Sequence, residues 1–205
     1  MLNSRHKPIL NRALKPLATV VARTGVSPTA ITLAALLLTA LVCAWFLRSR
    51  AVVPFCLLMG GVSFLDALDG AVARAGRRVT AFGAYLDAVC DRYVDTLVAL
   101  SAAWVTGYWV LCMAVLAGSL LVSYAKARAA MEVPVSNQEW PDLMERAERG
   151  VLFLVGLLAG ALIPWQPFGR DLFWWTLVIL AGLVHLTVIQ RVLRARGFIQ
   201  ARASS

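Results

Sequence analysis

The sequence predicts an all-α integral membrane protein, with six transmembrane helices preceded by an amphipathic interfacial helix. Of the 205 residues, 60% are hydrophobic and 15% are charged, which leaves too little polar surface for a soluble globule of this size. Six apolar stretches lie between polar or Pro/Gly-rich breaks, and each is long enough to cross a hydrocarbon core about 30 Å thick. Basic residues gather in alternate connections between these stretches, as in multi-pass membrane proteins.

The first 24 residues predict a cytosolic N-terminal segment with a juxtamembrane helix at 8–24. One helical face of this segment is apolar and is formed by Leu10, Leu14, Leu17 and Val21. Basic residues on the remaining surface would attract anionic headgroups. A basic tail without a helix is the alternative. The segment lacks an apolar core followed by a small-residue cleavage site, so it is not a secretory signal.

The membrane domain is predicted over residues 25–196 and begins at a strong helix start. Ser27 is a preferred N-cap residue, and Pro28 suits the first helical position. The predicted spans are 28–47, 51–75, 82–105, 107–130, 146–165 and 171–193. A polar cytosolic loop is expected at 131–144, and a cytosolic tail at 197–205.

The charge distribution predicts a multi-pass protein of the cell membrane with both termini in the cytosol. With that orientation, sixteen of the twenty Lys and Arg residues lie on cytosolic segments, as the positive-inside rule requires. The net charge of +9 is then accounted for by membrane topology, so no nucleic-acid partner is expected. The four cysteines have no CxxC spacing and are interpreted as small buried apolar residues: Cys43, Cys56, Cys90 and Cys112.

Five of the eleven acidic residues lie between positions 65 and 95. Asp66 and Asp69 are spaced i, i+3 on the second predicted span, and Asp87, Asp91 and Asp95 are spaced i, i+4, i+8 on the third. A charged side chain inside a bilayer costs about 2.5–3.5 kcal/mol even on the mildest scales. The short turn between the two spans makes them an antiparallel hairpin, so four carboxylates are expected to meet at matching depth.

Converging carboxylates would repel one another unless a hard cation holds them, and oxygen ligands favour Mg²⁺, Mn²⁺ or Ca²⁺ over zinc or copper. Substrate phosphates would complete such a coordination shell. Gly70 and Gly83 permit close approach of the two helices. Arg74, one turn after Gly70, is placed to contact a phosphate.

Two alternatives stay open at this point. In the first, the acids only form ion pairs within the hairpin, with Arg74, Arg77, Arg78 and Arg92. In the second, the chain is an ion-coupled membrane transporter whose carboxylates bind the transported cation. Against the transporter, the acids lie near one mouth of the membrane domain, and the sequence has no inverted-repeat symmetry.

The pattern DxxDGxxAR, eight residues, then GxxxDxxxD resembles the signature of the CDP-alcohol phosphotransferases in every defining position. It is formed here by Asp66, Asp69, Gly70, Ala73, Arg74, Gly83, Asp87 and Asp91. The resemblance implies that a hydroxyl attacks the β-phosphate of a CDP-linked donor, usually CDP-diacylglycerol, and that CMP leaves. It also implies a homodimer and a Mg²⁺ or Mn²⁺ cofactor.

The same resemblance implies a role for each signature residue. Asp66, Asp69 and Asp87 are expected to bind the metal, and Asp91 to be a metal ligand or the catalytic base that accepts the hydroxyl proton. The CDP donor would be bound by Gly70, Ala73, Arg74 and Gly83. Asp95 lies outside the signature and is interpreted as a partner of Arg92.

Basic residues near the cytosolic ends of the last three spans suggest that the acceptor itself carries a phosphate. These segments resemble those of actinobacterial phosphatidylinositol phosphate synthases, where matching residues bind inositol phosphate. The resemblance gives this role to Lys126, Arg146, Arg149 and Arg191. Phosphatidylglycerophosphate synthases, which use glycerol 3-phosphate, are the alternative within the family. The simpler alternative is that these residues only anchor the protein to anionic lipids.

Overall fold

The computed structural model describes Thr19 and residues 27–75, 80–132 and 143–203 of the chain. Within these ranges it leaves out the side chains at positions 67, 69, 70, 73–75 and 201–203. The predicted juxtamembrane helix at 8–24, apart from Thr19, and most of the 131–144 loop therefore lie outside the described residues. Every regular element in the described part of the chain is helical, which agrees with the predicted fold class.

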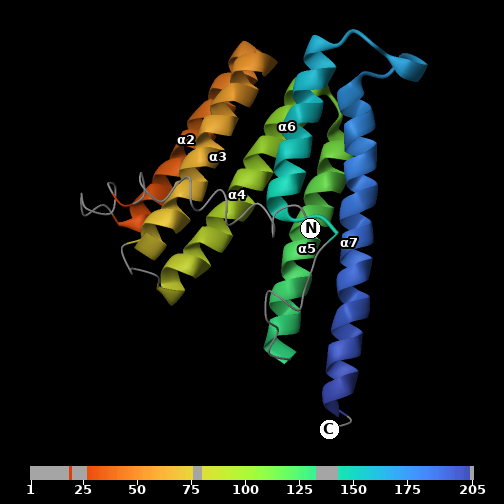
Figure 1. Cartoon of the computed structure of the whole chain (residues 1–205). Coiled ribbons are helices and arrows are strands. Elements are labelled where there is room, and N and C mark those ends of the chain that lie inside the picture. Colours follow the sequence, from red (N-terminus) through yellow and green to blue (C-terminus); the bar gives the residue numbers. More distant parts are fainter. Residues whose placement is uncertain (1–18, 20–26, 76–79, 133–142, 204–205) are drawn as a thin grey trace. The chain divides into compact units, whose positions relative to one another are not determined.

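In the described part of the chain, six long α-helices follow one another (Figure 1). They are α2 (Pro28–Ser49), α3 (Val52–Ala75), α4 (Ala81–Thr106), α5 (Trp109–Glu132), α6 (Arg146–Leu162) and α7 (Leu172–Ala203), with the short 3-10 helix η1 (Pro167–Gly169) before α7. The first of them starts as predicted, because the Ser27 hydroxyl accepts a hydrogen bond from the Ala30 amide at 3.1 Å.

Two helix ends differ from the predicted spans by more than two residues. Helix α6 ends at Leu162 rather than 165, because Pro164 holds the preceding residue, Ile163, in an extended conformation with φ −105° and ψ 110°. Helix α7 continues to Ala203 rather than ending near 193, through residues of high helix propensity such as Ala, Arg and Gln. At 1.5 Å per residue α7 is about 48 Å long, which exceeds the thickness of the hydrocarbon core.

Three described helices are long and apolar enough to cross a membrane, namely Pro28–Ser49, Trp109–Glu132 and Leu172–Gln200, and Val52–Asp66 is a shorter apolar stretch. The protein is therefore a multi-pass membrane protein. The aspartates interrupt the apolar character of α3 and α4, so six spans stay a prediction. All four cysteines are buried, as their sequence context predicts.

The chain divides into two compact units, of which the first runs from Leu2 to Gly107. In this unit α2 packs against both α3 and α4. The rings of Phe46 and Phe55 stack with centroids 3.9 Å apart and fasten the end of α2 to the start of α3. Helix α4 ends at Thr106 and is capped by Gly107, whose φ of 79° is the left-handed conformation that glycine adopts without steric cost.

The second unit contains α5, α6 and α7, and both α5 and α6 pack against α7. Glycines form the contact surfaces: a Cβ at Gly118 would overlap Val184, and one at Gly156 would overlap Thr176. Small residues let membrane helices approach closely enough for backbone and side chains to pack. The rings of Phe153 and Phe173 meet edge to face at 5.3 Å and extend the α6–α7 contact.

A polar link joins the start of α5 to the start of α7. The Tyr108 hydroxyl donates a hydrogen bond to Asp171 Oδ2 at 2.9 Å, and Asp171 Oδ1 accepts one from the Trp174 amide at 2.8 Å. Asp171 thus caps α7. Burial, and then the hydrogen bond to Asp171, raise the pKa of Tyr108 above its usual 10.0, so the phenol remains a donor at neutral pH.

The contact at Gly156 gives a test of the α6–α7 packing. Gly156→Ala is expected to lower the Tm of the detergent-solubilised protein by roughly 2–10 °C, because overpacking costs about 1–3 kcal/mol. Gly150→Ala is the matched control on the same helix, since no atom lies within 4 Å of a Cβ added there; it should leave the Tm unchanged or slightly raised. Equal Tm values for the two variants, measured by thermal unfolding, would contradict this packing.

Candidate functional site

Three of the predicted carboxylates come together between α3 and α4. Asp66, Asp87 and Asp91 each present an oxygen, and these oxygens all lie within 4.8 Å of one another. All three residues are partly exposed. The i, i+4 spacing of Asp87 and Asp91 puts them on one face of α4, and the antiparallel α3 brings Asp66 to the same level.

The spacing of these oxygens fits a single divalent cation. Ligand oxygens about 2.1–2.4 Å from an ion lie on the order of 4–5 Å apart across its coordination sphere. Carboxylates as the donor set favour Mg²⁺, Mn²⁺ or Ca²⁺. The residues present therefore fit a hard cation, and substrate oxygens would complete its coordination.

Local sequence explains how α4 starts beside this cluster. The Thr80 hydroxyl accepts a hydrogen bond from the Gly83 amide at 3.0 Å and so caps the helix. A Cβ at Gly83 would lie 2.9 Å from that hydroxyl oxygen. Gly83, which the family resemblance assigns to the donor pocket, thus also has a local reason to be glycine.

Four other signature residues, Asp69, Gly70, Ala73 and Arg74, lie on helix α3, and the structure does not describe their side chains. Asp69 as a metal ligand and the other three as donor-binding residues stay predictions.

Arg92 is the one arginine of the ion-pair alternative whose side chain the structure describes. Its Nη2 lies 3.8 Å from Asp91 Oδ2 and 3.6 Å from Asp95 Oδ2. The predicted pairing of Arg92 with Asp95 is confirmed, and the contact with Asp91 is an addition to it.

Two of the predicted acceptor residues are buried arginines in the second unit. Arg149 is 6% exposed, and its Nη1 donates a hydrogen bond to the Met144 carbonyl at 3.0 Å. Arg191 is 5% exposed, and its Nη1 donates to the Val122 carbonyl of α5. A buried guanidinium requires hydrogen-bond acceptors, and these carbonyls fix where each side chain lies.

The remaining two acceptor candidates lie close in the sequence to the residues that supply those carbonyls. Lys126 is one helical turn after Val122 on α5, and Arg146 is the first residue of α6, two positions after Met144. Both are partly exposed. All four basic residues thus belong to one unit, at the end of α5, the start of α6 and the C-terminal half of α7. Their binding of a phosphate stays a prediction.

Sequence reasoning missed one residue that positions this region. The Gln190 side chain accepts a hydrogen bond from the Leu143 amide at 3.2 Å and so ties the segment before α6 to α7. A single glutamine on an apolar helix gives no signal for this contact, because its partner is a backbone amide of an irregular segment. The sequence likewise gives no signal for the contact between Arg149 and the Met144 carbonyl.

Comparison with known proteins identifies relatives over nearly the whole chain. The family model of the CDP-alcohol phosphatidyltransferases matches residues 25–188. The archaetidylinositol phosphate synthase of Methanothermobacter thermautotrophicus is 35% identical over 198 residues, covering 94% of this chain and 93% of the relative. The phosphatidylinositol phosphate synthase of Corynebacterium glutamicum is 32% identical over 191 residues, covering 89% and 83%.

Solved structures show a similar fold. The phosphatidylinositol phosphate synthase of Mycobacterium tuberculosis with CDP-DAG bound matches with a TM-score of 0.77 and 26% identity, over 90% of this chain and 94% of that chain. The structure of the same enzyme in complex with manganese and citrate matches with a TM-score of 0.77 and 25% identity, over 89% and 88%.

The carboxylate cluster predicts a measurable metal site. Titration of the purified protein with Mn²⁺, followed by the electron paramagnetic resonance signal of the free ion, should show saturable binding. Asp66→Asn, Asp87→Asn or Asp91→Asn should each weaken it by about tenfold or more, because each removes an anionic ligand. Asp171→Asn, at a carboxylate in the other unit, is the control. Unchanged Mn²⁺ affinity in all three ligand variants would refute the site.

Proposed function

The chain belongs to the CDP-alcohol phosphatidyltransferase family, and we propose that it transfers a phosphatidyl group from CDP-diacylglycerol to a hydroxyl of inositol phosphate. The products are CMP and phosphatidylinositol phosphate. The observation that carries this proposal is the convergence of Asp66, Asp87 and Asp91 in a chain that the family model matches over residues 25–188. Family membership favours a transferase over the ion-coupled transporter.

The proposed reaction replaces the phosphoanhydride bond of the donor by a phosphate ester bond to the acceptor. An acceptor hydroxyl oxygen forms a bond to the β-phosphorus of the donor, and the bond from that phosphorus to the oxygen of CMP breaks. Asp66, Asp69, Asp87 and Asp91 would hold a divalent cation, which offsets the charge of the pyrophosphate and of the departing CMP. Asp91 accepts the hydroxyl proton when its carboxylate is not needed as a ligand.

The inositol phosphate acceptor is supported by the named relatives and by the basic residues of the second unit. Both sequence relatives described above are named for products containing inositol phosphate, although their lipid parts differ. We assign the acceptor phosphate to Lys126, Arg146 and Arg191. Arg149 is assigned with them, and like Arg191 it keeps further donors after binding a backbone carbonyl through one nitrogen.

The donor would bind at Gly70, Ala73, Arg74 and Gly83. Small side chains at three of these positions leave room for a nucleotide, and an arginine is suited to a phosphate. A homodimer is proposed from family resemblance alone, and its test is the mass of the detergent-solubilised protein by light scattering.

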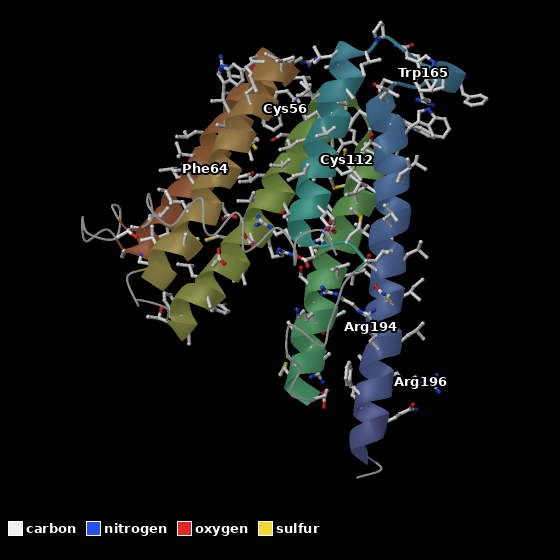
Figure 2. The ribbon with its side chains drawn as sticks, viewed as in Figure 1. Cys56, Phe64, Cys112, Trp165, Arg194 and Arg196 are labelled. Carbon is white, nitrogen blue, oxygen red and sulfur yellow. The ribbon has the colours of Figure 1, made fainter. Side chains whose placement is uncertain are left out.

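The proposed location is the cell membrane, with the reaction at its cytosolic face. Figure 2 supports this orientation within the second unit: Arg194 and Arg196 lie on the C-terminal part of α7, and Trp165 lies at the opposite end, in the connection before α7. Arginines favour the cytosolic side, and tryptophans favour the membrane interface. Cysteines introduced at Arg77 and Asn137 should react with a membrane-impermeant reagent from the cytosolic side, and one at Gln166 from outside. The reverse labelling pattern would overturn the orientation.

A panel of acceptors tests the proposed function directly. Purified protein supplied with CDP-diacylglycerol and Mg²⁺ should release CMP with 1D-myo-inositol 3-phosphate, and much more slowly with glycerol 3-phosphate or free inositol. Turnover of glycerol 3-phosphate without turnover of inositol phosphate would assign the chain to the phosphatidylglycerophosphate synthases instead. CMP release that persists after complete chelation of divalent ions would remove the metal from the mechanism.

Variants at the basic residues separate acceptor binding from donor binding. Lys126→Ala or Arg191→Ala should raise the KM for inositol phosphate about tenfold or more and change the KM for CDP-diacylglycerol little, because each removes a charge-assisted hydrogen bond to the acceptor phosphate. Arg128→Ala and Arg194→Ala are matched controls on the same two helices. Equal effects of the variants and their controls would contradict the acceptor role of Lys126 and Arg191.

A further inference from the structure

The guanidinium of Arg92 contacts both Asp91, a member of the metal cluster, and Asp95, which lies outside the cluster. The Nη2 atom of Arg92 lies 3.8 Å from Asp91 Oδ2 and 3.6 Å from Asp95 Oδ2. The side chains of Asp91 and Asp95 are 17% and 22% exposed and that of Arg92 is 25% exposed, so solvent screens these contacts only in part. Because the two distances are nearly equal, the attraction of Arg92 to the two carboxylates is of similar size.

The contact of Arg92 with both carboxylates follows from the spacing of the three residues on α4. Asp91 and Asp95 are i, i+4 on α4 and share a face, and Arg92 and Asp95 are i, i+3. The long Arg92 side chain reaches Asp91, its neighbour in the sequence, from an adjacent face of the helix. Asp91 is also one of the three converging carboxylates with Asp66 and Asp87. It therefore faces two competing cations when the cluster holds a metal: Arg92 and the ion itself.

We propose that Arg92 and Asp95 are a positioning pair that sets the availability of Asp91. Asp95 attracts the Arg92 guanidinium about as strongly as Asp91 does, so Arg92 competes less with a metal ion for the Asp91 carboxylate than it would without Asp95. Arg92 in turn holds the Asp91 carboxylate in a fixed orientation. The inference rests on the proposed function of Asp91, and it explains why a fifth aspartate lies beside the four of the signature.

The two residues predict opposite effects on metal binding. In Asp95→Asn, Arg92 retains Asp91 as its charged neighbour and binds it more tightly, so the Mn²⁺ dissociation constant should rise about 10- to 100-fold, as for other groups that support a metal ligand. In Arg92→Gln, the competitor is gone, so Mn²⁺ affinity should be unchanged or higher. The kcat should still fall, because Asp91 has lost its fixed orientation.

The double variant Arg92→Gln with Asp95→Asn distinguishes this pair from a general structural role. It removes the competing charge together with the residue that restrains it, so Mn²⁺ affinity should return close to that of the wild type. Asp95→Glu should also preserve affinity, because it keeps the carboxylate. Measurements of Tm for every variant identify any that fail to fold, and such a variant is replaced by its conservative counterpart.

Free Mn²⁺, followed by electron paramagnetic resonance in the absence of both substrates, is the readout. Weak binding by Asp95→Asn with recovery in the double variant supports the pair. Wild-type affinity in Asp95→Asn, or a double variant as weak as Asp95→Asn, would overturn the pair while leaving the metal site intact. If the wild type itself does not bind Mn²⁺, both the pair and the proposed metal site are wrong.

Discussion

Like charges held close together in an apolar chain are the constraint on which the rest of this structure depends. Asp66, Asp87 and Asp91 bring three carboxylate oxygens within 4.8 Å of one another on helices that cross or border a membrane. Three carboxylates this close to one another repel. A divalent cation would offset that repulsion, and the phosphates of a nucleotide-linked lipid could then bind to the same ion. The packing of α2 against α3 and α4, and the Thr80 cap, hold the cluster in place.

The second unit also contains charged groups that are held close to the protein interior, in this case two arginines. Arg149 and Arg191 are almost fully buried, and each donates to a backbone carbonyl of a neighbouring segment. Arg191 thereby joins α7 to α5, and Arg149 joins α6 to the segment that precedes it. A guanidinium has five donors in a fixed plane, so one bond to a carbonyl leaves others for a phosphate. The same side chains can therefore support the fold and bind the acceptor.

The sequence was sufficient to predict features that depend on short spacings. Ser27 and Pro28 predicted the start of α2, and the i, i+4 repeat of the aspartates predicted their common face on α4. Contacts that involve irregular backbone could not be predicted from the sequence. No pattern in it pairs Gln190 with the Leu143 amide or Arg149 with the Met144 carbonyl. The end of α7 was also missed, because helix propensity, rather than hydropathy, carries that helix beyond position 193. Gly83 shows a third case, in which a residue expected to serve the donor also has a local role beside the Thr80 hydroxyl.

The measurement that tests the central claim most directly is CMP release by Asp91→Asn. The substitution removes the negative charge while keeping the size and shape of the side chain, so the fold and membrane insertion should persist. If Asp91 is a metal ligand or the proton acceptor, CMP release from CDP-diacylglycerol should fall by at least about 10²-fold relative to the wild type. Near-normal turnover by the folded variant would show that the carboxylate cluster is not where the transfer takes place.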